Sequence, residues 1–133
     1  DAGGSGFSAI PGRTKATQAP AAIGACWSTV GDSGSNPATH FLGTTDAQPL
    51  VLRTRNVQSL RLEPSAELFG GNPITANVIA GSSQNFVTPG VRGATIAGGG
   101  VPLGDSDPAT IGEGPNRVAD SYGSIGGGYA NVV

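Results

Sequence analysis

The sequence predicts an all-β protein in which a short β-hairpin module precedes a glycine-rich β-roll or β-solenoid. Glycine accounts for 23 of 133 residues, while only 12% are charged and 5% aromatic. Because 37% of the residues are still hydrophobic, this composition favours very short strands and tight turns over disorder. Two further observations support this prediction: a stretch of alternating apolar and polar residues, and a glycine-rich motif that occurs twice in nearly the same form.

The chain begins with a segment of small residues punctuated by proline and glycine. Residues 1–26 contain no helical or strand-like periodicity. Such composition is typical of an extended segment. We therefore expect residues 1–26 to form an extended N-terminal arm.

Residues 27–71 contain the alternating pattern. Residues 50–55 (LVLRTR) and 60–63 (LRLE) alternate apolar and polar side chains, which indicates two strands of a hairpin with leucines on one face and arginines on the other. We expect the turn at Asn56-Val57 and the end of the second strand at Pro64. This region is predicted to be a small hairpin connector module.

Residues 72–133 repeat a unit built from an isoleucine, glycine and an Asn-x-Val sequence. The phrases GATIAGGG (93–100) and GSIGGG (123–128) are two of its copies. In the first and third copies the isoleucine and valine are 8 positions apart; in the middle copy they are 22 apart, so 22 − 8 leaves 14 extra residues. We expect these to form an inserted loop at residues 101–115, and the following side chains to point into the core: Ile79, Val87, Ile96, Val118 and Ile125.

A repeat this short favours the rung of a coil. Helix pairs and propeller blades need about 30 residues or more, whereas a β-solenoid rung needs only one or two inward aliphatic side chains and a corner. Glycine suits the corners because it adopts positive φ without steric cost, and asparagine is the next best tolerated residue.

Several classes of function are disfavoured by the sequence. The formal charge of −2 and scattered basic residues do not predict nucleic-acid binding, and the chain has neither an apolar run of about 18 residues nor a basic amphipathic helix, so we expect no membrane insertion by this segment. The sequence GDSG at 31–34 resembles the nucleophile motif of serine proteases, but the single histidine, His40, follows it and is more consistent with a structural role. Cys26, the one cysteine, allows no internal disulfide.

Acidic residues gather in and near the inserted loop. Asp105, Asp107, Glu113 and Asp120 supply the oxygen ligands that calcium prefers. Their spacing matches neither an EF-hand nor a nonapeptide calcium repeat. We therefore expect no cofactor and no metal, with calcium binding as the alternative.

The amino-acid sequences of three segments resemble a known type of module. The block NPATHFLGTTDAQPLVLRTRNVQSLRLEP, followed by GVRGATIAGGG and NRVADSYGSIGGGYANVV, is similar to a recurrent module of bacterial and phage trimeric fibre proteins, whose glycine-rich coils are similar to the heads of trimeric autotransporter adhesins. The resemblance implies a homotrimer of interlocked left-handed parallel β-rolls on an extracellular fibre. The residues point the same way, because so few rungs bury little apolar area in one chain.

The function expected is that of a non-enzymatic structural or adhesive fibre segment, on a cell surface or a phage-like particle. Its partners would be its own copies and a host or surface receptor, a glycan or a matrix protein. The inserted loop is the candidate contact surface, with Asp105, Asp107 and Glu113 as its candidate residues. One alternative is a filament subunit whose N-terminal arm joins the next subunit by strand addition, and another is a polysaccharide-cleaving enzyme that uses the same three carboxylates.

Overall fold

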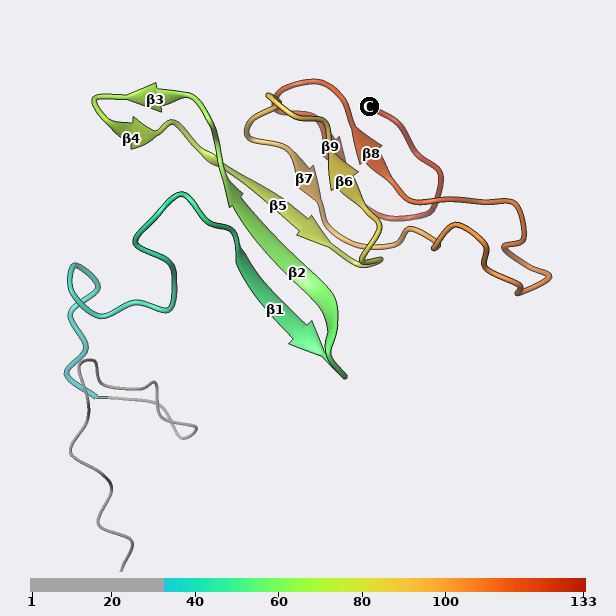
Figure 1. Ribbon diagram of the computed structural model, residues 1–133, viewed down its shortest axis with the longest axis horizontal. Helices are drawn as coiled ribbons and strands as arrows, with labels where there is room; N and C mark the ends of the chain where they lie inside the picture. Colours follow the sequence, from blue (N-terminus) through green and yellow to red (C-terminus); the bar gives the residue numbers. More distant parts are fainter. Residues whose placement is uncertain (1–32) are drawn as a thin grey trace, which may run out of the picture. The chain divides into compact units, whose positions relative to one another are not determined.

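The computed structural model describes residues 33–133, so the predicted arm lies outside the described residues (Figure 1). The chain divides into two compact units, Asp1–Leu42 and Gly43–Val133. The described part of the first unit is a turn around Asn36, whose carbonyl accepts hydrogen bonds from the backbone N–H groups of Thr39 (2.9 Å) and His40 (2.7 Å).

The second unit is all-β, and residues 33–133 contain no helix. Five strands form one sheet in the order β1-β2-β5-β7-β9, while β3 pairs with β4 and β6 with β8. The boundaries are β1 Leu50–Thr54, β2 Val57–Pro64, β3 Leu68–Phe69, β4 Asn72–Pro73, β5 Ala76–Ala80, β6 Phe86–Val87, β7 Thr95–Ile96, β8 Arg117–Val118 and β9 Ser124–Ile125.

Strands β1 and β2 form the predicted antiparallel hairpin. Leu50 pairs with Leu62, and Leu52 pairs with Leu60, so the leucines share one face as the alternation predicted. β2 ends at Pro64, also as predicted.

The predicted position of the hairpin turn is wrong by one residue. The turn residues are Arg55 and Asn56, with φ of 49° and 62°, and two successive positive φ angles define the type I′ geometry that fits the twist of a hairpin. The pairing register shifts after Leu52, so a bulge absorbs the odd residue. Asn56 is therefore the second residue of the turn, whereas the expected Asn56-Val57 turn placed it first.

The hairpin continues directly into the glycine-rich region. β2 pairs antiparallel with β5, and the position between residues 71 and 72, where the sequence placed a domain boundary, lies in the short β3–β4 hairpin. Gly70 and Gly71 form its turn, with φ of 60° and 85°.

From β5 onward the neighbouring strands are parallel and in register with the repeat. Ile79 lies beside Ile96, and Ile96 beside Ile125. On the second sheet Val87 lies beside Val118. Figure 1 shows the chain passing alternately between these two groups of strands, from β5 to β6, then β7, β8 and β9.

All five side chains expected to point inward are buried between the two groups of strands. Ile79, Ile96 and Val118 are completely buried, Ile125 is 4% exposed and Val87 is 9% exposed. Ala94, which the sequence analysis did not select, completes the same cluster.

The region from β5 to β9, with its two groups of parallel strands, is called the coil below. Three asparagines, one from each Asn-x-Val sequence, stack at one of its corners. Asn85 donates to the carbonyls of Ala80 and Gly99, at 2.9 and 3.0 Å. The Asn85 side-chain oxygen accepts the backbone N–H of Asn116 at 2.8 Å, and Asn116 accepts in the same way from Asn131 at 3.0 Å. Each asparagine thus connects its own corner to the next.

This arrangement corrects the reason given for asparagine at the corners. None of these three asparagines has positive φ; instead Asn85 and Asn116 are 1% and 0% exposed and satisfy buried backbone groups. Most of the positive φ angles in this region belong to glycines, such as Gly99 at 69°, while Tyr122 and Ala130 also have positive φ, at 64° and 54°. A Cβ on Gly99 would overlap the carbonyl oxygen of Gly128 in the next rung, so only glycine permits this stacking distance.

Candidate functional site

The inserted loop leaves the coil from a fixed base. It lies between β7 and β8, and residues 101–115 contain no strand. The Val101 N–H donates to the Gly114 carbonyl at 3.1 Å, and Ala130 donates to the same carbonyl at 2.9 Å. The Val101 side chain is 8% exposed, so it anchors the loop at its start. Figure 1 shows the loop extending away from the strands on this side of the unit.

Asp105, which is half-buried, and Asp107, which is exposed, accept hydrogen bonds from other residues of the loop. The Thr110 hydroxyl donates to Asp105 Oδ2 at 2.5 Å, and the Ala109 N–H donates to Asp107 Oδ1 at 2.9 Å. The hydrogen bond from Thr110, aided by the backbone N–H groups of Asp107 and Ser106, lowers the pKa of Asp105 below its ordinary value. Both carboxylates therefore serve as turn formers.

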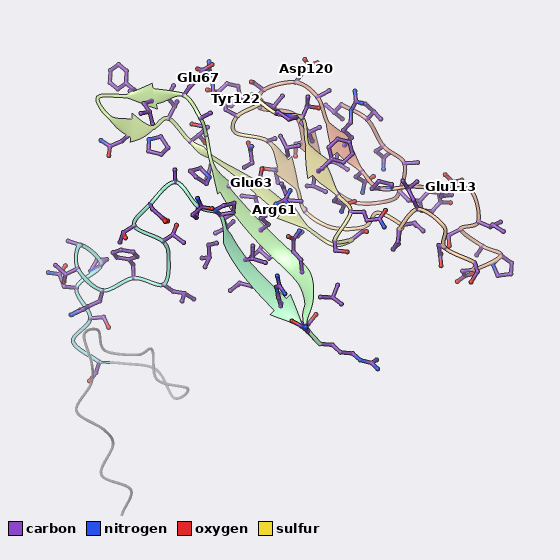
Figure 2. The ribbon with its side chains drawn as sticks, in the orientation of Figure 1. Arg61, Glu63, Glu67, Glu113, Asp120 and Tyr122 are labelled. Carbon is purple, nitrogen blue, oxygen red and sulfur yellow. The ribbon has the colours of Figure 1, made fainter. Side chains whose placement is uncertain are left out.

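The four acidic residues considered as calcium ligands do not gather at one point. Figure 2 shows Glu113 on the loop and Asp120 at the other corner of the coil, in the connection between β8 and β9. Within residues 33–133 no group of three His, Cys, Asp or Glu side chains is arranged to hold a metal ion.

Two apolar side chains of the loop are largely exposed to solvent. Leu103 is 70% exposed and Ile111 is 68% exposed. The Leu103 backbone is held by a 2.8 Å hydrogen bond from its N–H to Gln84 Oε1, which ties the loop to the β5–β6 corner. Leu103 and Ile111 were not among the predicted contact residues, although they stand as an isolated leucine and isoleucine in a Pro/Gly/Asp-rich stretch.

The opposite corner contains a small charged and aromatic cluster. Arg92 forms an ion pair with Glu67 and lies 5.9 Å from the ring centre of Tyr122, close enough for a cation–π interaction. The Tyr122 N–H donates to the Arg92 carbonyl at 2.8 Å. Figure 2 shows Glu67 and Tyr122 near each other at this end of the unit. The cluster connects the β2–β5 connection to the coil, and the sequence analysis did not select it.

His40, in the first unit, accepts a hydrogen bond at Nδ1 from the Asn36 N–H at 3.0 Å. This contact closes a local turn.

Comparison of the chain with protein-family models, curated proteins and solved structures found no match. Residues 33–133 contain no membrane-spanning helix.

Proposed function

We propose that this chain is a non-enzymatic structural and adhesive segment of an extracellular trimeric fibre. In this proposal the region from β5 to β9 is a left-handed parallel β-roll, and three copies associate into a rigid shaft. The loop at 101–115 contacts a receptor, a glycan or a matrix protein. The fibre belongs to a cell surface or to a phage-like particle.

The observation that supports the proposal best is the in-register parallel stacking of identical side chains. Ile79, Ile96 and Ile125 align on one sheet, and Val87 and Val118 on the other. The asparagine ladder joins the same rungs along their corner. A rigid coil of this kind suits mechanical support, since each rung repeats the same backbone contacts.

The small size of the core supports association of several copies. The buried cluster of the second unit comprises six residues, none aromatic. Small cores rarely stabilise a chain by themselves, and oligomerisation is one of the usual remedies. Association would also cover several exposed apolar side chains.

The internal use of the loop carboxylates supports a non-enzymatic role. Asp105 and Asp107 are engaged with Thr110 and with backbone N–H groups. Paired carboxylates of a glycosidase must instead reach a sugar from both sides. Leu103 and Ile111, which face outward, are better suited to binding than to hydrolysis.

The first test is the solution mass of the chain, measured by light scattering at several concentrations. A constant mass of three subunits is expected. Growth of the mass with concentration would instead support the alternative, a filament assembled by strand addition through the N-terminal arm, for which β1 offers an edge strand of the sheet. A monomer at all concentrations would reject both.

The second test addresses adhesion. The trimer and a Leu103→Ala, Ile111→Ala double variant would be applied to arrays of glycans and immobilised matrix proteins, with Phe69→Ala as the control because Phe69 is 83% exposed but lies outside the loop. Binding that survives in the control and is lost in the double variant is expected. Equal binding by all three proteins would reject the loop as the contact surface.

A further inference from the structure

The outer face of the five-stranded sheet is unusual because it is aliphatic across β1, β2 and β5. Alternation along the strands separates the two faces: Ile79 and Ile96 point into the coil, so their strand neighbours point away from it. The outward positions include six aliphatic residues, which we call the leucine face: Leu50, Leu52, Leu60, Leu62, Val78 and Ala80. Leu52 is 42% exposed and the other five are half-buried.

The charges of the central strand are on the opposite face. Arg61 pairs across the sheet with Ile79, and Glu63 with Asn77, so both share the face that carries the core. Arg61 Nε lies 2.8 Å from Glu63 Oε1 as an ion pair; Figure 2 shows the two residues together beside β2. An antiparallel sheet in water normally has its core on one side and polar residues on the other, and here the second side is aliphatic across the paired centres of β1, β2 and β5.

The remaining positions of this face carry no charge either. Thr54 and Pro64 flank the leucines, and Thr95 and Ser124 continue the row of Val78 onto β7 and β9. The face therefore changes from aliphatic to hydroxyl-bearing along the sheet, with no ionised group at these positions. An uncharged aliphatic face of this kind is a candidate surface for contact with another protein.

We propose that the leucine face is the surface through which copies of this chain pack against one another. This inference rests on the proposed trimer and names its interface. A second copy is the fitting occupant because an uncharged aliphatic face can pack against an identical face, whereas its lack of charge gives a charged or sugar ligand nothing to bind.

The leucine face is small for a protein interface. Three strands of five residues, spaced about 4.8 Å apart with a rise of about 3.3 Å per residue, cover about 240 Å². A stable pair of proteins buries about 800 Å² on each partner, so this face is too small to hold an isolated dimer. Three copies that converge around an axis bury each face against two neighbours and bring adjacent surfaces into contact as well.

The decisive experiment compares the solution mass of the full chain with that of a Leu52→Glu, Leu60→Glu double variant. Three converging copies would bring six carboxylates together, so the mass should fall from three copies to one while the far-ultraviolet circular dichroism stays that of the wild type. The matched control is Phe69→Glu, which adds a charge at an exposed aromatic residue away from the face and should remain trimeric.

Crosslinking gives a test that does not depend on the folding of the charged variant. In a Cys26→Ser background, Leu52→Cys should yield crosslinked species between copies with a short bis-maleimide, whereas Phe69→Cys should not. A double glutamate variant that stays trimeric, or a trimeric Leu52→Cys variant that does not crosslink, overturns the leucine-face interface while leaving the trimer intact. A wild-type chain that is monomeric overturns the proposed trimer, and with it this interface.

Discussion

Removal of the Asn116 side chain should weaken the coil more than any other single truncation to alanine at its asparagine corner. Asn116 is completely buried. Its amide donates to the carbonyls of Gly98 at 3.2 Å and Gly128 at 2.9 Å, and its oxygen accepts from the N–H and the side-chain amide of Asn131 at 3.0 and 2.9 Å. Asn116→Ala therefore removes four hydrogen bonds at once.

The magnitude follows from which partners water can reach afterwards. A hydrogen bond contributes about 1 kcal/mol net, and a buried group left without a partner costs about 1–3 kcal/mol. Asn131 is exposed, so its donors can bind water instead. The loss then comes chiefly from the two glycine carbonyls, and we expect Asn116→Ala to lower the free energy of unfolding by about 2–4 kcal/mol.

The assay is denaturant unfolding followed by circular dichroism, with all proteins at one chain concentration. Asn131→Ala is the matched control; because Asn131 is exposed at the last rung, its loss should cost about 1 kcal/mol or less. Asn116→Asp keeps the shape but cannot donate to the two carbonyls, so it should be at least as destabilising as alanine at neutral pH. If Asn116→Ala and Asn131→Ala lowered stability equally, the ladder would not be the source of the effect.

Three further predictions concern the corners, the core and the loop. Gly99→Ala should destabilise the unit far more than Gly104→Ala. Both glycines have positive φ, but only at Gly99 would the added Cβ meet the backbone of the next rung. Thermal unfolding compares the two variants, and similar decreases in melting temperature would contradict the stacking argument. Ile96→Ala should cost about 2–5 kcal/mol and Ile96→Asp should abolish the folded trimer, so an Ile96→Asp protein with unchanged mass and melting temperature would show that this position is not a core position. The pKa of Asp105 is lowered in the folded loop, so the ionised carboxylate stabilises the folded state above its ordinary pKa, and this stabilisation is lost as the pH falls through the lowered value. Thr110→Val should raise the pKa of Asp105 toward 3.8, which NMR titration of the carboxyl carbon would measure. An unchanged pKa would mean that Thr110 is not the cause.

The candidate site illustrates the limits of sequence reasoning on an irregular segment. The position of the loop followed from the repeat, because 14 residues exceed the regular spacing. The roles within it did not follow, since Asp105 and Asp107 form contacts with residues only two to five positions away and Leu103 and Ile111 are exposed. Composition gives the residue types in a loop, but only the path of the backbone decides which of them reach solvent.

The sequence by itself determined the all-β class, the leucine pairing of the hairpin and the periodic selection of Ile79, Ile96 and Ile125. These features depend on local period and on the spacing of small residues, which a single chain displays directly. The tertiary structure alone decided that the asparagines form a ladder, that β2 joins the hairpin to the coil in one sheet, and that the leucine face is left uncovered by the coil. Each of these features depends on contacts between distant parts of the chain. Only those contacts decide which groups a buried polar side chain hydrogen-bonds to and whether another element packs on a given sheet face.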